Sequence, residues 1–170
     1  MFKKVLRNIG IWGYIAFGVL ALLFVFGEIL DDPGETQAVV FVAACLLPLA
    51  VLIYLVMVNV SFIKPLMVSL AVASTLFGVV SAIIPRQWET FRFTNGPILG
   101  IAVLIVTFAM ALWARNEAQL AGLLMVVMTL TPLIAESIGQ GRVHIGGSSF
   151  ALMFPGALAG ALILLSADRK

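Results

Sequence analysis

Two glutamates lie within apolar stretches and are the residues of this chain best suited to chemistry inside a membrane. Glu28 and Glu136 each follow an uninterrupted apolar run. Ionisable groups within membrane segments are costly, commonly face the interior of a helix bundle and often line ion or substrate pathways. Both glutamates fall near the end of their run, where a carboxylate can instead reach lipid headgroups or pair with an arginine. The sequence therefore leaves open a proton or cation site and simple interfacial anchoring.

The only histidine, His144, lies in a glycine-rich segment two residues after Arg142. A histidine titrates near neutral pH, so His144 and Glu136 are candidates for a pH-sensitive pair. Together with Arg142 they could also form a lipid-active enzyme at the membrane surface, and the plainer interpretation is a loop histidine at an interface. One histidine without cysteine partners is a poor metal-ligand set, so the sequence predicts no metal site and no cofactor.

Other chemical motifs are absent or have structural explanations. The acidic segment 31–35 suits a divalent cation, but Asp32, Pro33 and Glu35 also form a helix-capping pattern. The chain has no Gly-x-Ser-x-Gly motif, no aspartate pair within an apolar run and no phosphate-binding glycine loop. Its single cysteine, Cys45, excludes an intrachain disulfide and is predicted to be a buried apolar residue. We therefore predict that the protein is not an enzyme.

The elements that position these residues follow from composition. Of 170 residues, 62% are hydrophobic and 11% are charged, and the mean hydropathy is +1.16. Soluble domains carry about 25% charged residues, and crossing a bilayer takes about 20 apolar residues per helix. The sequence predicts an all-α polytopic membrane protein, a compact bundle of six transmembrane helices forming a single domain over residues 1–170. The predicted helices span about 9–30, 33–60, 62–84, 97–114, 117–138 and 149–166.

The distribution of basic residues predicts orientation. An N-terminus in the cytoplasm places seven lysines and arginines inside, against three outside, which supports cytoplasmic termini in a plasma or inner membrane. The first apolar run is too long for a signal peptide and is predicted to be retained. The net charge is only +2, and the basic residues are too few and too scattered to form a nucleic-acid-binding surface. Trp12, Tyr14, Tyr54 and Trp113 are predicted to lie near the inner membrane surface.

Small residues and prolines mark the predicted helices. Gly156 and Gly160 have the spacing that lets helix backbones approach closely, and Ser74 and Gly78 repeat it. Either pair could serve packing within the bundle or docking of another subunit. Three prolines, Pro48, Pro132 and Pro155, fall inside predicted helices and are expected to kink them. Thr129 and Thr131 are expected to bond the carbonyls that Pro132 frees.

These features favour a non-enzymatic accessory or scaffolding subunit that acts through helix–helix contacts. Its expected partners are membrane lipids and another membrane protein subunit. The alternative is a small transporter or channel for a proton, cation or small solute, with Glu28 and Glu136 beneath the Arg142/His144 segment. The lipid-active enzyme is the third hypothesis.

Overall fold

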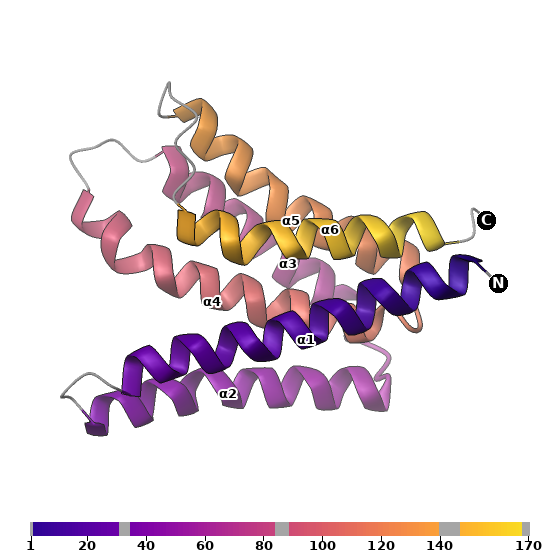
Figure 1. Cartoon of the computed structure of the whole chain (residues 1–170), viewed down its shortest axis with the longest axis horizontal. Coiled ribbons are helices and arrows are strands. Elements are labelled where there is room, and N and C mark those ends of the chain that lie inside the picture. The colour runs from indigo at the N-terminus through magenta and orange to yellow at the C-terminus, as the bar shows by residue number, and fades with distance from the viewer. Residues whose placement is uncertain (1, 31–34, 84–88, 140–146, 168–170) are drawn as a thin grey trace.

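The computed structural model of the chain contains six α-helices, and none of the residues it describes is in a strand. It describes the backbone of residues 2–30, 35–83, 89–139 and 147–167, and the side chains of 2–24, 26–27, 40, 42–80, 100–135 and 153–167. The all-helical class is confirmed. The helices are α1 (Phe2–Leu30), α2 (Glu35–Val58), α3 (Ile63–Ile83), α4 (Glu89–Trp113), α5 (Ala118–Gly139) and α6 (Gly147–Ser166). The start of α1 and the end of α6 lie at the same end of the molecule (Figure 1).

Two helices begin well before the predicted positions. Helix α1 starts at Phe2 rather than near residue 9, and α4 starts at Glu89 rather than near residue 97. Pro97 therefore lies inside α4 and not in its first turn. Hydropathy marks the part of a helix that suits hydrocarbon, whereas backbone hydrogen bonding can continue into polar flanks at the membrane surface.

Three of the six helices are long and apolar enough to cross a membrane, by length and composition. These segments are Phe2–Phe24, Ile63–Val80 and Ala118–Ala135. The other three helices contribute shorter apolar segments, Val42–Val58, Gly100–Trp113 and Met153–Ser166, counted over the described residues. On this measure the structure supports three membrane-spanning helices, not the predicted six.

Helix α4 is the centre of the bundle. Every side chain from Val103 to Ala111 is buried, and α4 packs against each of the other five helices. A helix that is apolar on all sides belongs in the interior of a bundle. Gly18 lets α1 approach closely, because a Cβ added there would lie only 2.6 Å from Cδ2 of Phe108. The core is therefore built around one helix.

Burial contradicts the predicted inner belt of aromatic residues at two of its four positions. Trp12 and Tyr54 are 54% and 65% exposed, as a side chain at a membrane surface should be. Trp113 and Tyr14 are 1% and 2% exposed, so they lie inside the bundle and face no headgroups. The sequence gives their place along the helix, but the side of the helix they occupy depends on packing that a linear sequence does not display.

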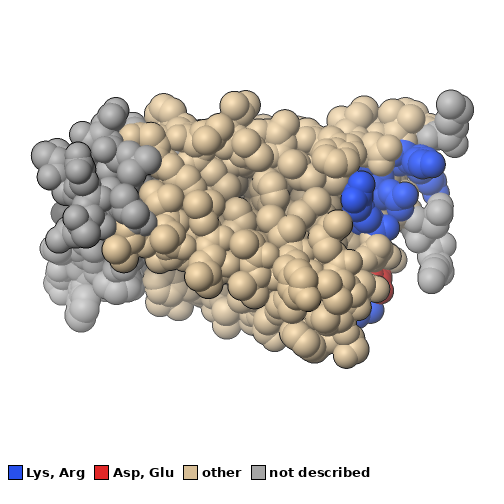
Figure 2. Space-filling model, turned by 90° about the horizontal axis from the view of Figure 1, so that it is seen from below, with Lys and Arg blue, Asp and Glu red and all other residues tan. Residues whose placement is uncertain are grey.

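The turns before α3 and α5 are short and lie at one end of the bundle. Helix α2 ends in a Schellman motif: Asn59 has a φ of 53°, its N–H donates to the carbonyl of Val56, and the N–H of Val60 donates to that of Leu55. The Lys64 ammonium lies 3.6 Å from the Glu117 carboxylate, which joins the start of α3 to the start of α5. Every described lysine and arginine side chain gathers at this end (Figure 2).

Candidate functional site

The four predicted pathway residues fall outside the described side chains. Glu28 lies in α1 and Glu136 lies in α5, each within the last turn of its helix, but their side chains are not among those described. Arg142 and His144 lie outside the described residues altogether. In the described part, α1 and α5 share no extensive contact, while α4 and α6 each pack against both. The helices that carry the two glutamates are therefore held apart by other helices.

A chain of hydrogen bonds joins α1 to α4 in the buried interior. The Tyr14 and Thr107 hydroxyls are 2.6 Å apart, and Thr107 Oγ1 is also 2.6 Å from the carbonyl of Val103. A carbonyl only accepts, so the single hydroxyl proton of Thr107 goes to Val103. Tyr14 therefore donates to Thr107. Both side chains are almost fully buried, and this arrangement uses every hydroxyl proton in the pair.

Thr129 carries another buried hydroxyl, but it does not form the predicted hydrogen bond. Its Oγ1 donates to the carbonyls of Met125 and Val126, at 2.7 and 3.3 Å. The carbonyl that Pro132 deprives of its donor is that of Met128, four residues earlier. The expectation that Thr129 satisfies the freed carbonyl is therefore wrong, because a threonine hydroxyl in a helix reaches back three or four residues.

The small residues of α6 lie at its contact with α5. A Cβ added at Gly156 would lie 2.8 Å from Cγ2 of Thr129 and 3.4 Å from the Tyr14 hydroxyl. At Gly160 an added Cβ would lie 2.9 Å from the carbonyl oxygen of Gly122. Gly122 lies on the α5 side of this contact, and a Cβ added there would lie 2.7 Å from the backbone nitrogen of Leu164. These glycines pack within the bundle and leave no free face for another subunit.

Sequence reasoning missed Gly122, although a signal for it exists. Ala118 and Gly122 are small residues four positions apart, which is the same spacing that singled out Gly156 and Gly160. It also missed the Tyr14–Thr107 pair, for which the sequence carries no signal, because the two residues are 93 positions apart.

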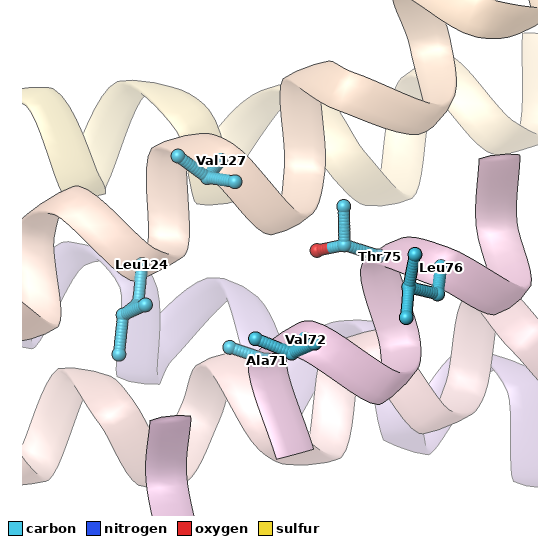
Figure 3. A pocket seen from close by; sticks show the side chains of 6 residues that line it. All are labelled: Ala71, Val72, Thr75, Leu76, Leu124 and Val127. Carbon is cyan, nitrogen blue, oxygen red and sulfur yellow. The ribbon is translucent and has the colours of Figure 1, made fainter. Parts of the chain in front are cut away.

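The other predicted small pair lies on α3. Gly78 is buried and Ser74 is half-buried, and α3 packs against α5 and α4. Next to this pair an apolar groove of about 150 Å³ opens between α3 and α5 (Figure 3). Its lining comes from both helices: Ala71, Val72, Thr75, Leu76, Leu124 and Val127.

Thr75 is the polar residue of the groove. Its Oγ1 is buried and, alone among the described buried side-chain oxygens and nitrogens, has no hydrogen-bond partner. Thr107 and Thr129 instead donate to carbonyls of their own helices. In Figure 3 the Thr75 hydroxyl points toward the space between the two helices. A buried hydroxyl without a partner costs about 1–3 kcal/mol, and a hydrogen-bonding group that entered the groove could recover part of this cost.

The groove borders an exposed stripe of small and apolar residues on α3. Its members recur at intervals of three and four residues, so they share one face of the helix. They are Ser69, Val72, Ala73, Leu76, Phe77 and Val80, all exposed. Ser69 and Ala73 form a small pair with the four-residue spacing of close helix contacts. Unlike the α6 glycines, this small pair is open to the surroundings of the bundle.

Metal ligation has no described candidate. Among the described side chains, no three of the His, Cys, Asp and Glu residues come together. Cys45 on α2 is half-buried. The sequence predicted a buried residue, so Cys45 is more exposed than expected.

Comparison with protein families, with curated proteins and with solved structures finds no match to this chain.

Proposed function

We propose that this protein is a multi-pass membrane protein that acts as a non-enzymatic accessory subunit, binding a transmembrane helix of a partner protein along α3 and α5. The exposed stripe of α3 beside the α3/α5 groove is the observation that carries the proposal. Helices associate in lipid through close van der Waals packing at small residues and through hydrogen bonds. Ser69 and Ala73 supply the small surface, and the groove supplies the recess.

Thr75 favours a helix over a lipid chain as the occupant. Its Oγ1 is buried in the groove wall and lacks a partner. An acyl chain offers no hydrogen-bonding group, whereas a partner helix carries serine or threonine hydroxyls and backbone carbonyls. In this proposal such a group forms a hydrogen bond with the Thr75 hydroxyl.

All six helices cross the membrane in this proposal. The helices outside the three apolar spans, α2, α4 and α6, contain 24, 25 and 20 residues. At 1.5 Å per residue, about 20 residues span the roughly 30 Å hydrocarbon core, so each is long enough. In this proposal the protein lies in the plasma or inner membrane. The end of the bundle with the described basic side chains faces the cytoplasm.

The packing favours this function over transport. Side chains from Val103 to Ala111 fill the centre of the bundle, and the Tyr14, Thr107 and Thr129 hydroxyls are bonded within it. A conducting pathway through this part would have to separate α4 from its neighbours. Glu28 and Glu136, the glutamates of the transport hypothesis, also lie on α1 and α5, which α4 and α6 hold apart.

Site-specific photo-crosslinking in the native membrane tests the proposal. A photoreactive amino acid at Leu76, in the groove, should yield a product with one other membrane protein, while the same probe at Leu47 should yield only lipid adducts. Leu47 is the matched control because it is 69% exposed on α2, compared with 59% for Leu76.

The groove variants then separate a specific partner from a chance neighbour. Thr75→Val should weaken the cross-link from Leu76 about fivefold, since an interhelical hydrogen bond contributes about 1 kcal/mol. Ala73→Trp, which fills the small surface, should abolish it. Lipid adducts alone at Leu76, a product of twice the chain's own mass, or a yield that neither variant changes would each refute a partner subunit in the groove.

A further inference from the structure

The end of the bundle that carries the described basic side chains also carries little described negative charge. Its basic residues come from three segments: Lys3, Lys4 and Arg7 on α1, Lys64 on α3, and Arg115 in the turn after α4. Glu117 is the one acidic side chain among those described, and it pairs with Lys64 at 3.6 Å. Positive charge therefore exceeds negative charge across this described surface (Figure 2).

The basic residues of α1 lie at the end of the helix that disfavours cations. Lys3, Lys4 and Arg7 lie in its first two turns, where the helix dipole is positive and cations are unfavourable by about 0.3–1 kcal/mol each in other helices. An anionic group bound at this end would remove that repulsion. Lys4 and Arg7 are three positions apart and so lie on neighbouring parts of one helix face.

Arg115 and Trp12 complete the surface. The Arg115 guanidinium carbon lies 5.3 Å from the centroid of the Trp12 ring, a cation–π contact between the α4–α5 turn and α1. A guanidinium over a ring face keeps its N–H donors at its own edge, where they can bind a phosphate in bidentate fashion. Trp12 is 54% exposed, in keeping with an indole at the level of lipid headgroups.

We infer that Lys4, Arg7, Arg115 and Trp12 form a binding surface for the phosphate headgroups of anionic phospholipids. Basic surfaces at the cytoplasmic ends of membrane helices attract anionic lipids, with about 1 kcal/mol gained per lysine or arginine near the surface. The inference rests on the membrane insertion proposed above, but not on the partner helix.

The test compares two spin-labelled phospholipids with the same acyl chains, phosphatidylglycerol and phosphatidylcholine. The full-length protein is reconstituted in phosphatidylcholine bilayers, and the fraction of each lipid immobilised by the protein is measured by electron paramagnetic resonance. We expect about a twofold preference for phosphatidylglycerol over the whole lipid shell, because a roughly fivefold gain at one charged site is diluted by the unselective sites. The preference should fall as salt is raised from 0.01 to about 1 M.

Charge variants locate the preference. Arg7→Gln with Arg115→Gln should reduce it strongly, because Lys4 alone of the three cations remains. By contrast, Lys64→Gln with Glu117→Gln, which removes an ion pair without changing net charge, should leave it intact. Arg115→Lys should retain part of it. An unchanged preference in the Arg7/Arg115 variant, or equal immobilisation of both lipids by the wild type, overturns the lipid surface. Absence of any immobilised lipid would instead refute membrane insertion, so the two failures are distinguishable.

Discussion

The buried hydroxyls of Tyr14 and Thr107 share a hydrogen bond, but removing one of them does not have the same effect as removing the other. Tyr14 donates to Thr107, and Thr107 donates to the carbonyl of Val103. Removing the tyrosine hydroxyl leaves Thr107 with its carbonyl acceptor. Removing the threonine hydroxyl leaves a buried tyrosine donor with no acceptor in the observed network. The direction of the hydrogen bonds thus predicts unequal costs at two residues that share one contact.

We expect Thr107→Val to destabilise the protein more than Tyr14→Phe. Loss of one satisfied hydrogen bond costs about 0.5–1.5 kcal/mol, whereas a buried donor left unpaired costs about 1–3 kcal/mol. The double variant should cost less than the sum of the two, because it leaves no orphaned donor. Reversible unfolding in mixed micelles measures all three. Tyr54→Phe, at a 65% exposed position, is the control and should be neutral. A larger cost for Tyr14→Phe would reverse the assigned direction.

The contact between α5 and α6 depends on glycines whose neighbours are backbone atoms. A Cβ at Gly122 would lie 2.7 Å from the nitrogen of Leu164 and 2.8 Å from the carbonyl oxygen of Gly160. Backbone atoms of a packed helix cannot rotate away as a side chain can, so the two helices must separate. Gly13 of α1 is the opposite case, with no atom within 4 Å of an added Cβ.

We therefore expect Gly122→Ala to destabilise the protein by about 1–3 kcal/mol, the usual cost of overpacking. Gly13→Ala should be neutral or stabilising by up to about 1 kcal/mol, because alanine is the better helix former. The same unfolding measurement compares the two variants, and cysteine cross-linking between α5 and α6 reports whether the crossing has opened. Equal effects of Gly122→Ala and Gly13→Ala would show that the close approach is not structurally required.

At the scale of the elements, the sequence predicted where the helices lie better than which helices pack against one another. Apolar runs located six helices, because the length of a run follows from its local composition. The runs failed at the starts of α1 and α4, where helical residues are polar. The spacing of Gly156 and Gly160 suggested a close helix contact, but its partner at Gly122 could not be identified from that spacing alone. Trp113 was misplaced at the membrane surface, because only packing distinguishes the two sides of a helix.

At the scale of the whole molecule, both tight turns lie at the same end. The turn of residues 59–62 precedes α3 and the turn of residues 114–117 precedes α5, and the Lys64–Glu117 ion pair joins them. The start of α1 and the end of α6 lie at this end as well (Figure 1). The six membrane crossings proposed above would require all four places to face one compartment. The excess of basic residues predicts that the compartment is the cytoplasm.

Cysteine labelling tests this topology in a Cys45→Ala parent. Ser61→Cys and Asn116→Cys should react with a membrane-impermeant maleimide in inside-out vesicles and not in right-side-out vesicles, because the proposed topology places both turns in the cytoplasm. Gln87→Cys, placed between α3 and α4, should show the reverse pattern, since one further crossing separates it from residue 61. Labelling of positions 61 and 116 from opposite sides would contradict the bundle itself, because their turns are joined by an ion pair. Labelling of both from the outside would keep the bundle and invert its orientation, showing that the positive-inside bias of this chain does not set its topology.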